Sequence, residues 1–275
     1  MSLPTSHRRF LQAAKVRLHL IKVSKYLPAS LRSLSWTPIK SGVFRQASSN
    51  YRRLYTFLSV RKQQHTLSVE RRRQLKLKAL AESLFKDKKK SYSVSVSENF
   101  IDNRLPMDQL RLLKTLFVPF NVSSSEKIQY LSPVTKFDRH GFKRRKRILV
   151  VTDKYVYLVA EEGKSFKLKH KLPISRIAKL EITSEKDNFL LLRIPTELKN
   201  QKGDLILEVP FLIEMITKII KITKKPEILN INPPDSKLTW HCQPFEKKGF
   251  ISITQGVNTQ PEIVKGKQRN LIVIG

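Results

Sequence analysis

The sequence predicts an α+β fold in which a helical N-terminal part precedes a small antiparallel β-barrel, a closing helix and further C-terminal strands. Three observations predict this fold. Apolar residues recur with helical spacing up to about residue 88, and the period changes to that of short strands from Lys127. Turn-forming residues then separate the strand candidates at short, regular intervals, which is typical of a small barrel or sandwich.

The N-terminal part is expected to hold three helices and a fourth short one. The first covers residues 7–26 and is limited by Pro28, and the second covers about 42–60. The third begins after Ser68, a favourable N-cap residue, and runs to about Lys88. Its apolar stripe consists of Leu77, Leu80, Ala81, Leu84 and Phe85. The short helix is expected at 107–117.

The second half of the chain is expected to form seven strands and then a helix. The strands are predicted at 130–137, 147–152, 155–160, 165–172, 177–183, 189–194 and 204–209. A helix follows at 211–223, with Ile216 on its buried face. Seven strands closed by one helix are the arrangement of pleckstrin-homology domains. Further strands are predicted at 228–231, 238–242, 250–254 and 271–274.

The charge of the chain calls for an anionic partner. The formal net charge is +32, far outside the range of an ordinary soluble domain. Thirteen Lys and Arg residues precede the first acidic residue, Glu70. Nucleic acid, an anionic membrane face and an acidic protein are the three classes of partner that such a charge attracts. The acid-free start also resembles a mitochondrial transit peptide, but its basic character continues well beyond a typical presequence.

The segment from Lys136 to Arg147 concentrates this charge in a predicted β-hairpin. Seven of its twelve residues are Lys or Arg, and a turn is expected at His140-Gly141. The spacing of Lys136 and Arg145-x-Arg147 is also the one that pleckstrin-homology domains use to bind inositol phosphates. We therefore predict a phosphoinositide site here, while a solvated edge hairpin is the alternative. The predicted site residues are Lys136, Arg145, Arg147, Lys143, Arg144 and Lys146.

The helix at 7–26 is a candidate calmodulin-binding segment. Six cations surround an apolar face, a profile shared by calmodulin targets and by helices that lie on membranes. A helix packed on the following domain is the third alternative. The apolar anchors are Phe10, Leu11, Ala14, Leu18 and Ile21.

Catalytic chemistry has little support, and no cofactor or metal is expected. The single cysteine, Cys242, excludes an internal disulfide and favours a reducing compartment. His241-Cys242 lacks a second ligand pair at metal spacing and is better explained as a strand end. Gly163-Lys-Ser165 is not a nucleotide-binding loop, because Leu158 stands where the first glycine is required. No apolar run is long enough to span a membrane.

Four motifs in order resemble the tail homology 1 domain of class I myosins. Ala81-Glu-Ser-Leu-Phe-Lys-Asp-Lys-Lys-Lys-Ser-Tyr92 resembles the opening of that domain, and Phe100-Ile-Asp-Asn-Arg-Leu105 resembles the motif that follows it. Lys136 to Thr152 resembles the basic hairpin of the short-tailed Ic and Ih types, the most similar members. Lys202-Gly-Asp-Leu-Ile-Leu207 with Ile213-Glu-Met-Ile-Thr-Lys218 resembles the motifs before and within the closing helix.

The resemblance implies a non-enzymatic module that binds phosphoinositides through Lys136 and Arg147, supported by Arg145, and links an actin-based motor to membranes. Its domains would be a basic neck or junction helix at 1–40 and a tail homology 1 domain at 41–275, with the pleckstrin-homology-like core at about 127–223. The implied location is the cytoplasm, at the peripheral membrane or cell cortex. Actin and ATP would act only through a motor domain, whose nucleotide-binding loop this chain lacks, so the chain is expected to be a tail fragment, a short isoform or a truncated product. A basic nucleic-acid-binding protein and a calmodulin-binding regulatory fragment are the alternative functions.

Overall fold

The structure is a computed structural model that describes residues 67–107, 109, 126–139, 141–163, 165–197, 203–242, 247–256 and 260–275, with eight positions between 46 and 58. The chain divides into two compact units, residues 1–67 and 68–275. The described positions between 46 and 58 are helical, as expected for the second predicted helix. The helix at 7–26 lies outside the described residues, and the domain limit at residue 40 stays a prediction.

Helix α4 (Val69–Phe85) confirms the third predicted helix and its N-cap. Ser68 accepts a hydrogen bond from the backbone N–H of Arg71 at 3.2 Å, which satisfies one of the free donors at the start of the helix. Leu77, Ala81 and Phe85, spaced by four residues, are buried. A second short helix, α5 (Tyr92–Ser97), follows α4 and was not predicted.

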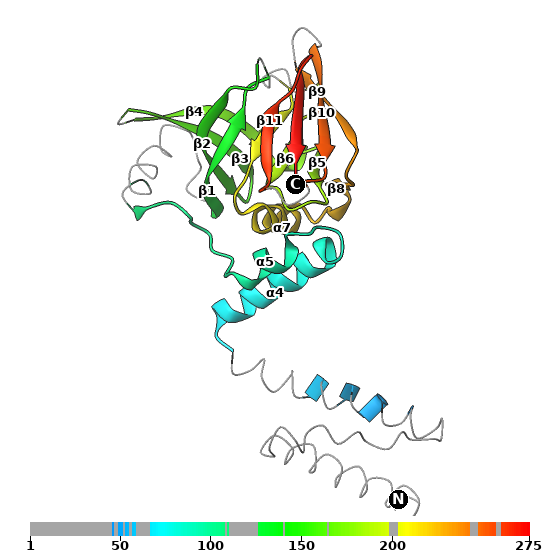
Figure 1. The fold of residues 1–275 in the computed structure, drawn as a ribbon. Helices are drawn as coiled ribbons and strands as arrows, with labels where there is room; N and C mark the ends of the chain where they lie inside the picture. The colour runs from blue at the N-terminus through cyan, green and yellow to red at the C-terminus, as the bar shows by residue number, and fades with distance from the viewer. Residues whose placement is uncertain are drawn as a thin grey trace, which may run out of the picture. The chain divides into compact units, whose positions relative to one another are not determined.

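The main sheet has eight strands in the order β4-β3-β2-β1-β7-β6-β5-β8 (Figure 1). All seven predicted strands are present, and pairs from β1 to β7 are antiparallel, whereas β8 joins β5 in parallel. The strand bounds are β1 (Ile128–Phe137), β2 (Arg144–Thr152), β3 (Tyr155–Glu162), β4 (Ser165–Pro173), β5 (Lys179–Thr183), β6 (Phe189–Arg193), β7 (Leu205–Glu208) and β8 (Leu229–Asn232).

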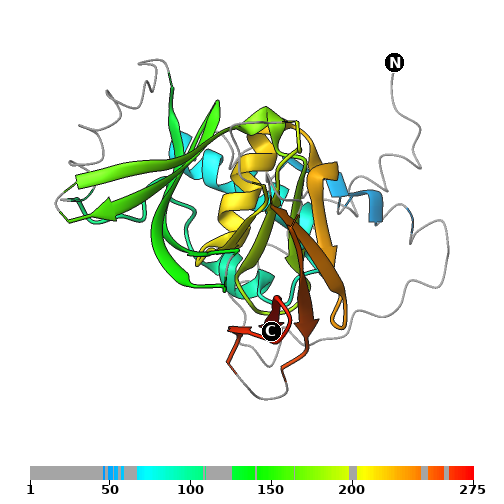
Figure 2. The same cartoon turned by 90° about the horizontal axis from the view of Figure 1, so that it is seen from above.

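Helix α7 (Leu212–Thr223) closes the sheet, as predicted. Residues 212–220 are all buried, because one side of the helix packs on the sheet and the other receives α4. Ile216 lies in this core with no exposed surface. In Figure 1, α7 lies below the strands, with the green strands β1 to β4 at the left and the C-terminal strands at the right, and Figure 2 shows the same arrangement from above. The α+β class and the pleckstrin-homology-like plan of seven strands and a closing helix are therefore confirmed. Short 3-10 helices η2 (Ile174–Arg176) and η3 (Pro226–Ile228) complete this part.

The C-terminal residues form a second sheet in the order β11-β12-β10-β9. Its core joins Trp240 and Ile251 to Phe189 and Ile206, so this sheet covers the face of β6 and β7 that points away from α7. Gly249 is required here, since a Cβ would lie 2.4 Å from the Trp240 ring. The bounds are β9 (Lys237–Cys242), β10 (Lys247–Thr254), β11 (Glu262–Lys265) and β12 (Asn270–Ile274), of which β11 was not predicted.

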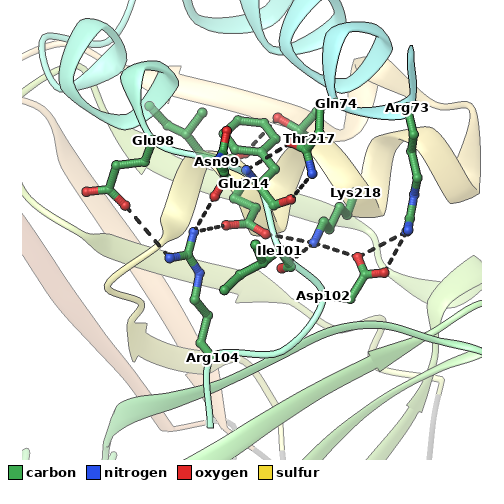
Figure 3. Close-up of polar contacts among 12 residues, drawn as sticks. Arg73, Gln74, Glu98, Asn99, Ile101, Asp102, Arg104, Glu214, Thr217 and Lys218 are labelled. Atoms are coloured by element: carbon green, nitrogen blue, oxygen red, sulfur yellow. Dashed lines mark hydrogen bonds and ion pairs between the residues drawn. The ribbon is translucent and has the colours of Figure 1, made fainter. Parts of the chain in front are cut away.

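A buried polar network fastens α7 to the residues that precede the sheet (Figure 3). Lys218 donates hydrogen bonds to Glu214 at 2.7 Å and to Asp102 at 3.0 Å. Arg104 donates to the other carboxylate oxygen of Glu214 at 2.7 Å, and Arg73 of α4 pairs with Asp102 at 2.8 Å. The side chains of Glu214 and Lys218 are each 3% exposed. Each cation of the network thus meets a carboxylate, the condition under which proteins tolerate buried charge.

Candidate anion-binding site

The β1–β2 hairpin places the three principal predicted residues on one face. The register pairs Lys136 with Arg145 and Val134 with Arg147. Side chains directly opposite, or two residues apart along a strand, point to the same face of a sheet. Val134 is buried in the core beneath α7. Lys136, Arg145 and Arg147 therefore lie on the same face of the sheet as Val134, the face that packs on α7. We call it the concave face, and the three residues lie at the edge of its core.

The turn of this hairpin forms where it was predicted. Gly141 has φ +79°, a left-handed conformation that glycine adopts without strain. The backbone N–H of Asp138 donates to the carbonyl of Lys143 at 3.0 Å and closes the turn. Phe142 is buried and meets Trp240 edge-on, with ring centroids 6.0 Å apart. The second sheet thus fixes the tip of the hairpin.

Strand β4 completes the face with residues that the sequence analysis missed. His170 stands opposite Leu158, a core residue, and Lys167 stands opposite Ala160. The Nζ atom of Lys136 lies 3.2 Å from Nε2 of His170. The alternation of Lys167, Leu168 and Lys169 indicates a strand with one basic face. No local sequence pattern, however, indicates that this strand lies near Lys136.

Arg147 lies within electrostatic reach of the β3–β4 end. The hydrogen bond from Lys169 holds the pKa of Glu162 below its usual value, and the charges of Lys169, Lys167 and Arg147 act in the same direction. The Lys169–Glu162 pair is 2.5 Å long. Cations from β2 and β4 therefore act together on the carboxylate of Glu162 at this edge.

The surroundings of Lys136 destabilise its positive charge. The pKa of its ammonium group is lowered to about 8, chiefly by partial burial and also by the cations of Arg139, Arg147 and Arg145, while Asp138 acts against them. A lysine with this environment gains most from a bound anion, because the anion would supply the charge that the fold leaves out.

The two arginines of β2 differ in how their guanidinium groups are held. Arg145 forms an ion pair with Asp138 at 2.5 Å. Arg147 donates from Nη1 to the carbonyl of Lys146 at 2.6 Å, and its buried Nε has no hydrogen-bond partner among the described residues. Arg147 is half-buried and forms no ion pair among the described residues, so its guanidinium group retains donor capacity for a ligand.

The remaining predicted cations lie elsewhere on the hairpin. Lys146 stands opposite Thr135 on the other face, and Lys143 is exposed in the turn. Arg144 donates to the carbonyl of Ile263 at 2.6 Å, which connects the hairpin to β11. The structure thus gives Arg144 a contact within the fold and leaves Lys143 and Lys146 on the surface.

A groove of about 810 Å³ opens beside Arg147, where β1 diverges from β7. Val134 and Ile148 form part of its apolar lining, and Glu161 and Glu208 contribute carboxylates. Arg147 is therefore accessible from this groove in addition to its position on the concave face.

The described residues do not support a metal centre or a membrane span. Among them, no group of three or more His, Cys, Asp or Glu side chains could hold a metal ion. His241 and Cys242 end strand β9, as predicted. Gly163 lies in the turn between β3 and β4. In the described part of the chain, no helix is both long and apolar enough to cross a bilayer. The predicted calmodulin anchors Phe10, Leu11, Ala14, Leu18 and Ile21 lie outside that part.

Comparison with known proteins identifies the family. Residues 89–274 match the family described as "Unconventional myosin tail, actin- and lipid-binding". Unconventional myosin IC of Drosophila melanogaster is 35% identical over 98% of this chain, and human unconventional myosin-Ih is 28% identical over 93%. The alignments cover 25% and 23% of those two proteins, so the chain spans about a quarter of their length.

Among solved structures, the Slm1 PH domain in complex with D-myo-inositol-4-phosphate is similar over 34% of this chain and 93% of its own, with 11% identity and a TM-score of 0.28. The family match covers more than half of the chain, and it includes the hairpin, the closing helix and the second sheet. The chain belongs to the family of unconventional myosin tails, the actin- and lipid-binding part of these proteins.

Proposed function

We propose that this chain holds membranes by binding the phosphate groups of phosphoinositides at the concave face of the β1–β2 hairpin. Lys136 and Arg147 would contact the phosphates, and Arg145 would support them. In a longer chain with a motor domain, this contact would join an actin-based motor to a membrane, at a peripheral position on the cytoplasmic side. The observation that supports the proposal most is the concave-face group of Lys136, Arg145 and Arg147, for which the described residues provide one ion pair, Arg145–Asp138.

Two contributions would hold the chain on a membrane, non-specific charge attraction and charge-assisted hydrogen bonds. Each basic residue near an anionic leaflet contributes about 1 kcal/mol, so exposed cations such as Lys143 and Lys146 provide recruitment without head-group preference. Charge-assisted hydrogen bonds from a positioned guanidinium or ammonium group contribute about 1.5–3 kcal/mol each. The concave-face residues would therefore supply the preference for phosphomonoesters over other anionic lipids.

Sedimentation with two kinds of vesicle tests the proposal. The vesicles carry equal total charge, one from phosphatidylserine and the other from phosphatidylinositol bisphosphate. Lys136→Ala and Arg147→Ala should each weaken binding to the phosphoinositide vesicles by about tenfold or more, as expected for one charge-assisted hydrogen bond. Lys221→Ala removes an exposed cation of α7 and is the matched control.

Equal losses for all three variants would show that binding is diffuse charge attraction and would overturn the proposed site. Duplex DNA at the same phosphate concentration provides the test of the nucleic-acid alternative. If DNA displaces the chain from both kinds of vesicle equally well, the lipid assignment fails.

A further inference from the structure

The contact between Lys136 and His170 crosses the concave face from β1 to β4. Nζ and Nε2 are 3.2 Å apart. An ammonium group has hydrogen-bond donors only, so Nε2 must accept, and the imidazole must be neutral with its proton on Nδ1. In this contact, His170 therefore serves as an acceptor for Lys136 and is not a cation.

The charges near this contact are mostly positive. Arg139 of the β1 end and Arg145 and Arg147 of β2 act on Lys136, and Asp138 opposes them. Lys169 on β4 is paired with Glu162 of β3. The charged groups that act on Lys136 are Asp138, Arg139, Arg145 and Arg147, and the neighbouring end of β3 and β4 carries Glu162, Lys167 and Lys169. Cations outnumber acids in this set, so a further positive charge on the imidazole is opposed until an anion enters.

A bound phosphomonoester would change both the acceptor for Lys136 and the charge around His170. It carries close to two negative charges near neutral pH and three acceptor oxygens, so it replaces Nε2 as the acceptor for the Lys136 ammonium group. The lone pair of Nε2 is then available, and the anion favours a positive charge beside it. The proton comes from solvent, forms the Nε2–H bond, and makes His170 a second donor to the same phosphate.

We infer that His170 takes up a proton when a phosphomonoester binds, so that lipid binding by this chain is coupled to pH and strengthens as the solution becomes more acidic. This inference rests on the proposed function, because it concerns the same site. A histidine normally titrates near pH 6.5, so the coupling falls in the physiological range. Full uptake of one proton would raise the affinity by up to about tenfold per pH unit within the coupled window.

Calorimetry with soluble inositol 1,4,5-trisphosphate measures the proton directly. Titrations of the full chain at pH 6.5, in two buffers with different ionisation enthalpies, give the number of protons taken up per ligand bound. His170→Gln keeps a donor and an acceptor at this position but cannot titrate. The phosphates of the ligand also exchange protons, and this contribution cancels when the two proteins are compared.

We expect the wild-type chain to take up about half a proton to one proton more than His170→Gln. Its affinity relative to that variant should rise about three- to tenfold between pH 7.5 and 6.0. His170→Arg, which is always charged, should bind without this additional pH dependence. Equal proton counts for the wild-type chain and His170→Gln would overturn the inference and leave the proposed function standing.

Two further arms separate the sources of phosphate. Vesicles with phosphatidylinositol bisphosphate should show the same pH dependence of the wild-type to His170→Gln ratio, whereas phosphatidylserine vesicles should not, since their phosphodiester does not titrate there. If inorganic phosphate binds as tightly as inositol trisphosphate, the lipid assignment is overturned. If the wild-type chain binds neither inositol trisphosphate nor phosphoinositide vesicles between pH 6.0 and 7.5, the proposed function and the inference both fail.

Discussion

Lys89 and Lys136 are two lysines with the same displaced pKa and opposite surroundings. Burial lowers the pKa of each to about 8. Lys89, just after α4, is completely buried and donates to the carbonyl of Asp187 at 2.8 Å and to Thr183 at 3.1 Å. The charges of Asp187 and Glu185 favour its protonated form. Lys136 instead has three arginines acting against it and one aspartate in its favour.

The presence or absence of a carboxylate partner also distinguishes two clusters of charged residues. In the network of Figure 3, the cations Arg104 and Lys218 share the buried carboxylate of Glu214. On the concave face, Lys136 has a neutral imidazole as its closest polar partner. The displaced pKa alone therefore does not identify a binding site. A cation whose counter-charge lies within the fold is part of the structure, and a cation without one is available to an external anion.

Replacing Lys89 should produce the largest effect of these substitutions. Lys89→Met leaves the buried carboxylate of Asp187 without its cation, and we expect the free energy of unfolding to fall by about 3 kcal/mol. Urea denaturation followed by circular dichroism measures the change. An unchanged or increased stability would mean that Lys89 is not compensated as the contacts indicate, and the comparison with Lys136 would lose its basis.

Replacing Glu214 tests the paired network in the same way. Glu214→Gln removes the charge that Lys218 and Arg104 share, and we expect a loss of about 2 kcal/mol in the free energy of unfolding, because Lys218 keeps its contact with Asp102. Glu82→Gln breaks an exposed ion pair with Lys86 on α4 and should leave the urea midpoint unchanged. Equal shifts for the two variants would contradict the distinction between buried and exposed pairs.

These two lysines also show what could be predicted from the sequence. All seven strands and the closing helix were predicted, because turns and changes of period are local signals. The common face of Lys136, Arg145 and Arg147 also follows from hairpin spacing. The burial of Lys89, in contrast, was not predicted. Asp187, the partner of buried Lys89, lies 98 residues away in the sequence. No local sequence pattern indicates a contact over such a separation.

The same limit explains the other omissions. His170 is 34 residues from Lys136, with two strands between them, so the residue most relevant to the chemistry of the site was not identified. Arg144 was predicted as a site residue from its position in the basic run, whereas its contact with Ile263 spans 119 residues. Strand β11 has only four residues and a single buried side chain, Ile263, which is too weak a signal for assignment.

Lys136→Met should stabilise the protein in the absence of lipid, and it should weaken lipid binding. The partially buried ammonium group destabilises the fold, and its removal should raise the free energy of unfolding by about 1 kcal/mol after allowance for solvent screening. The folded pKa of about 8 lies below the ordinary value of 10.5. The unfolded chain therefore binds more protons between these values, and the stability of the wild-type chain gains from this group as pH rises through that range.

The gain from Lys136→Met should thus be complete below pH 8 and should disappear as pH approaches 10.5. Urea unfolding of both proteins at pH 7 and pH 9.5 measures it. A variant that is less stable than the wild-type chain at pH 7 would show that Lys136 is compensated within the fold, as Lys89 is. The concave face would then lose its main argument as a site for an external anion.

The smallest expected effect comes from Asp138, the one carboxylate that acts in favour of Lys136. Asp138 forms an ion pair with Arg145, and the two side chains are 25% and 44% exposed. A pair in this environment contributes about 0.5 kcal/mol, so its loss changes stability little. Asp138→Asn should release Arg145 for a ligand and remove a negative charge from the site. We expect binding to phosphoinositide vesicles to strengthen about two- to threefold.

Lys169 and Glu162 form a similar pair at the outer edge, so Glu162→Gln makes the same charge change farther from Lys136 and should strengthen binding less. If Asp138→Asn weakens binding, the carboxylate positions Arg145 for the phosphate instead of competing with it, and Asp138 belongs to the site as a positioning residue.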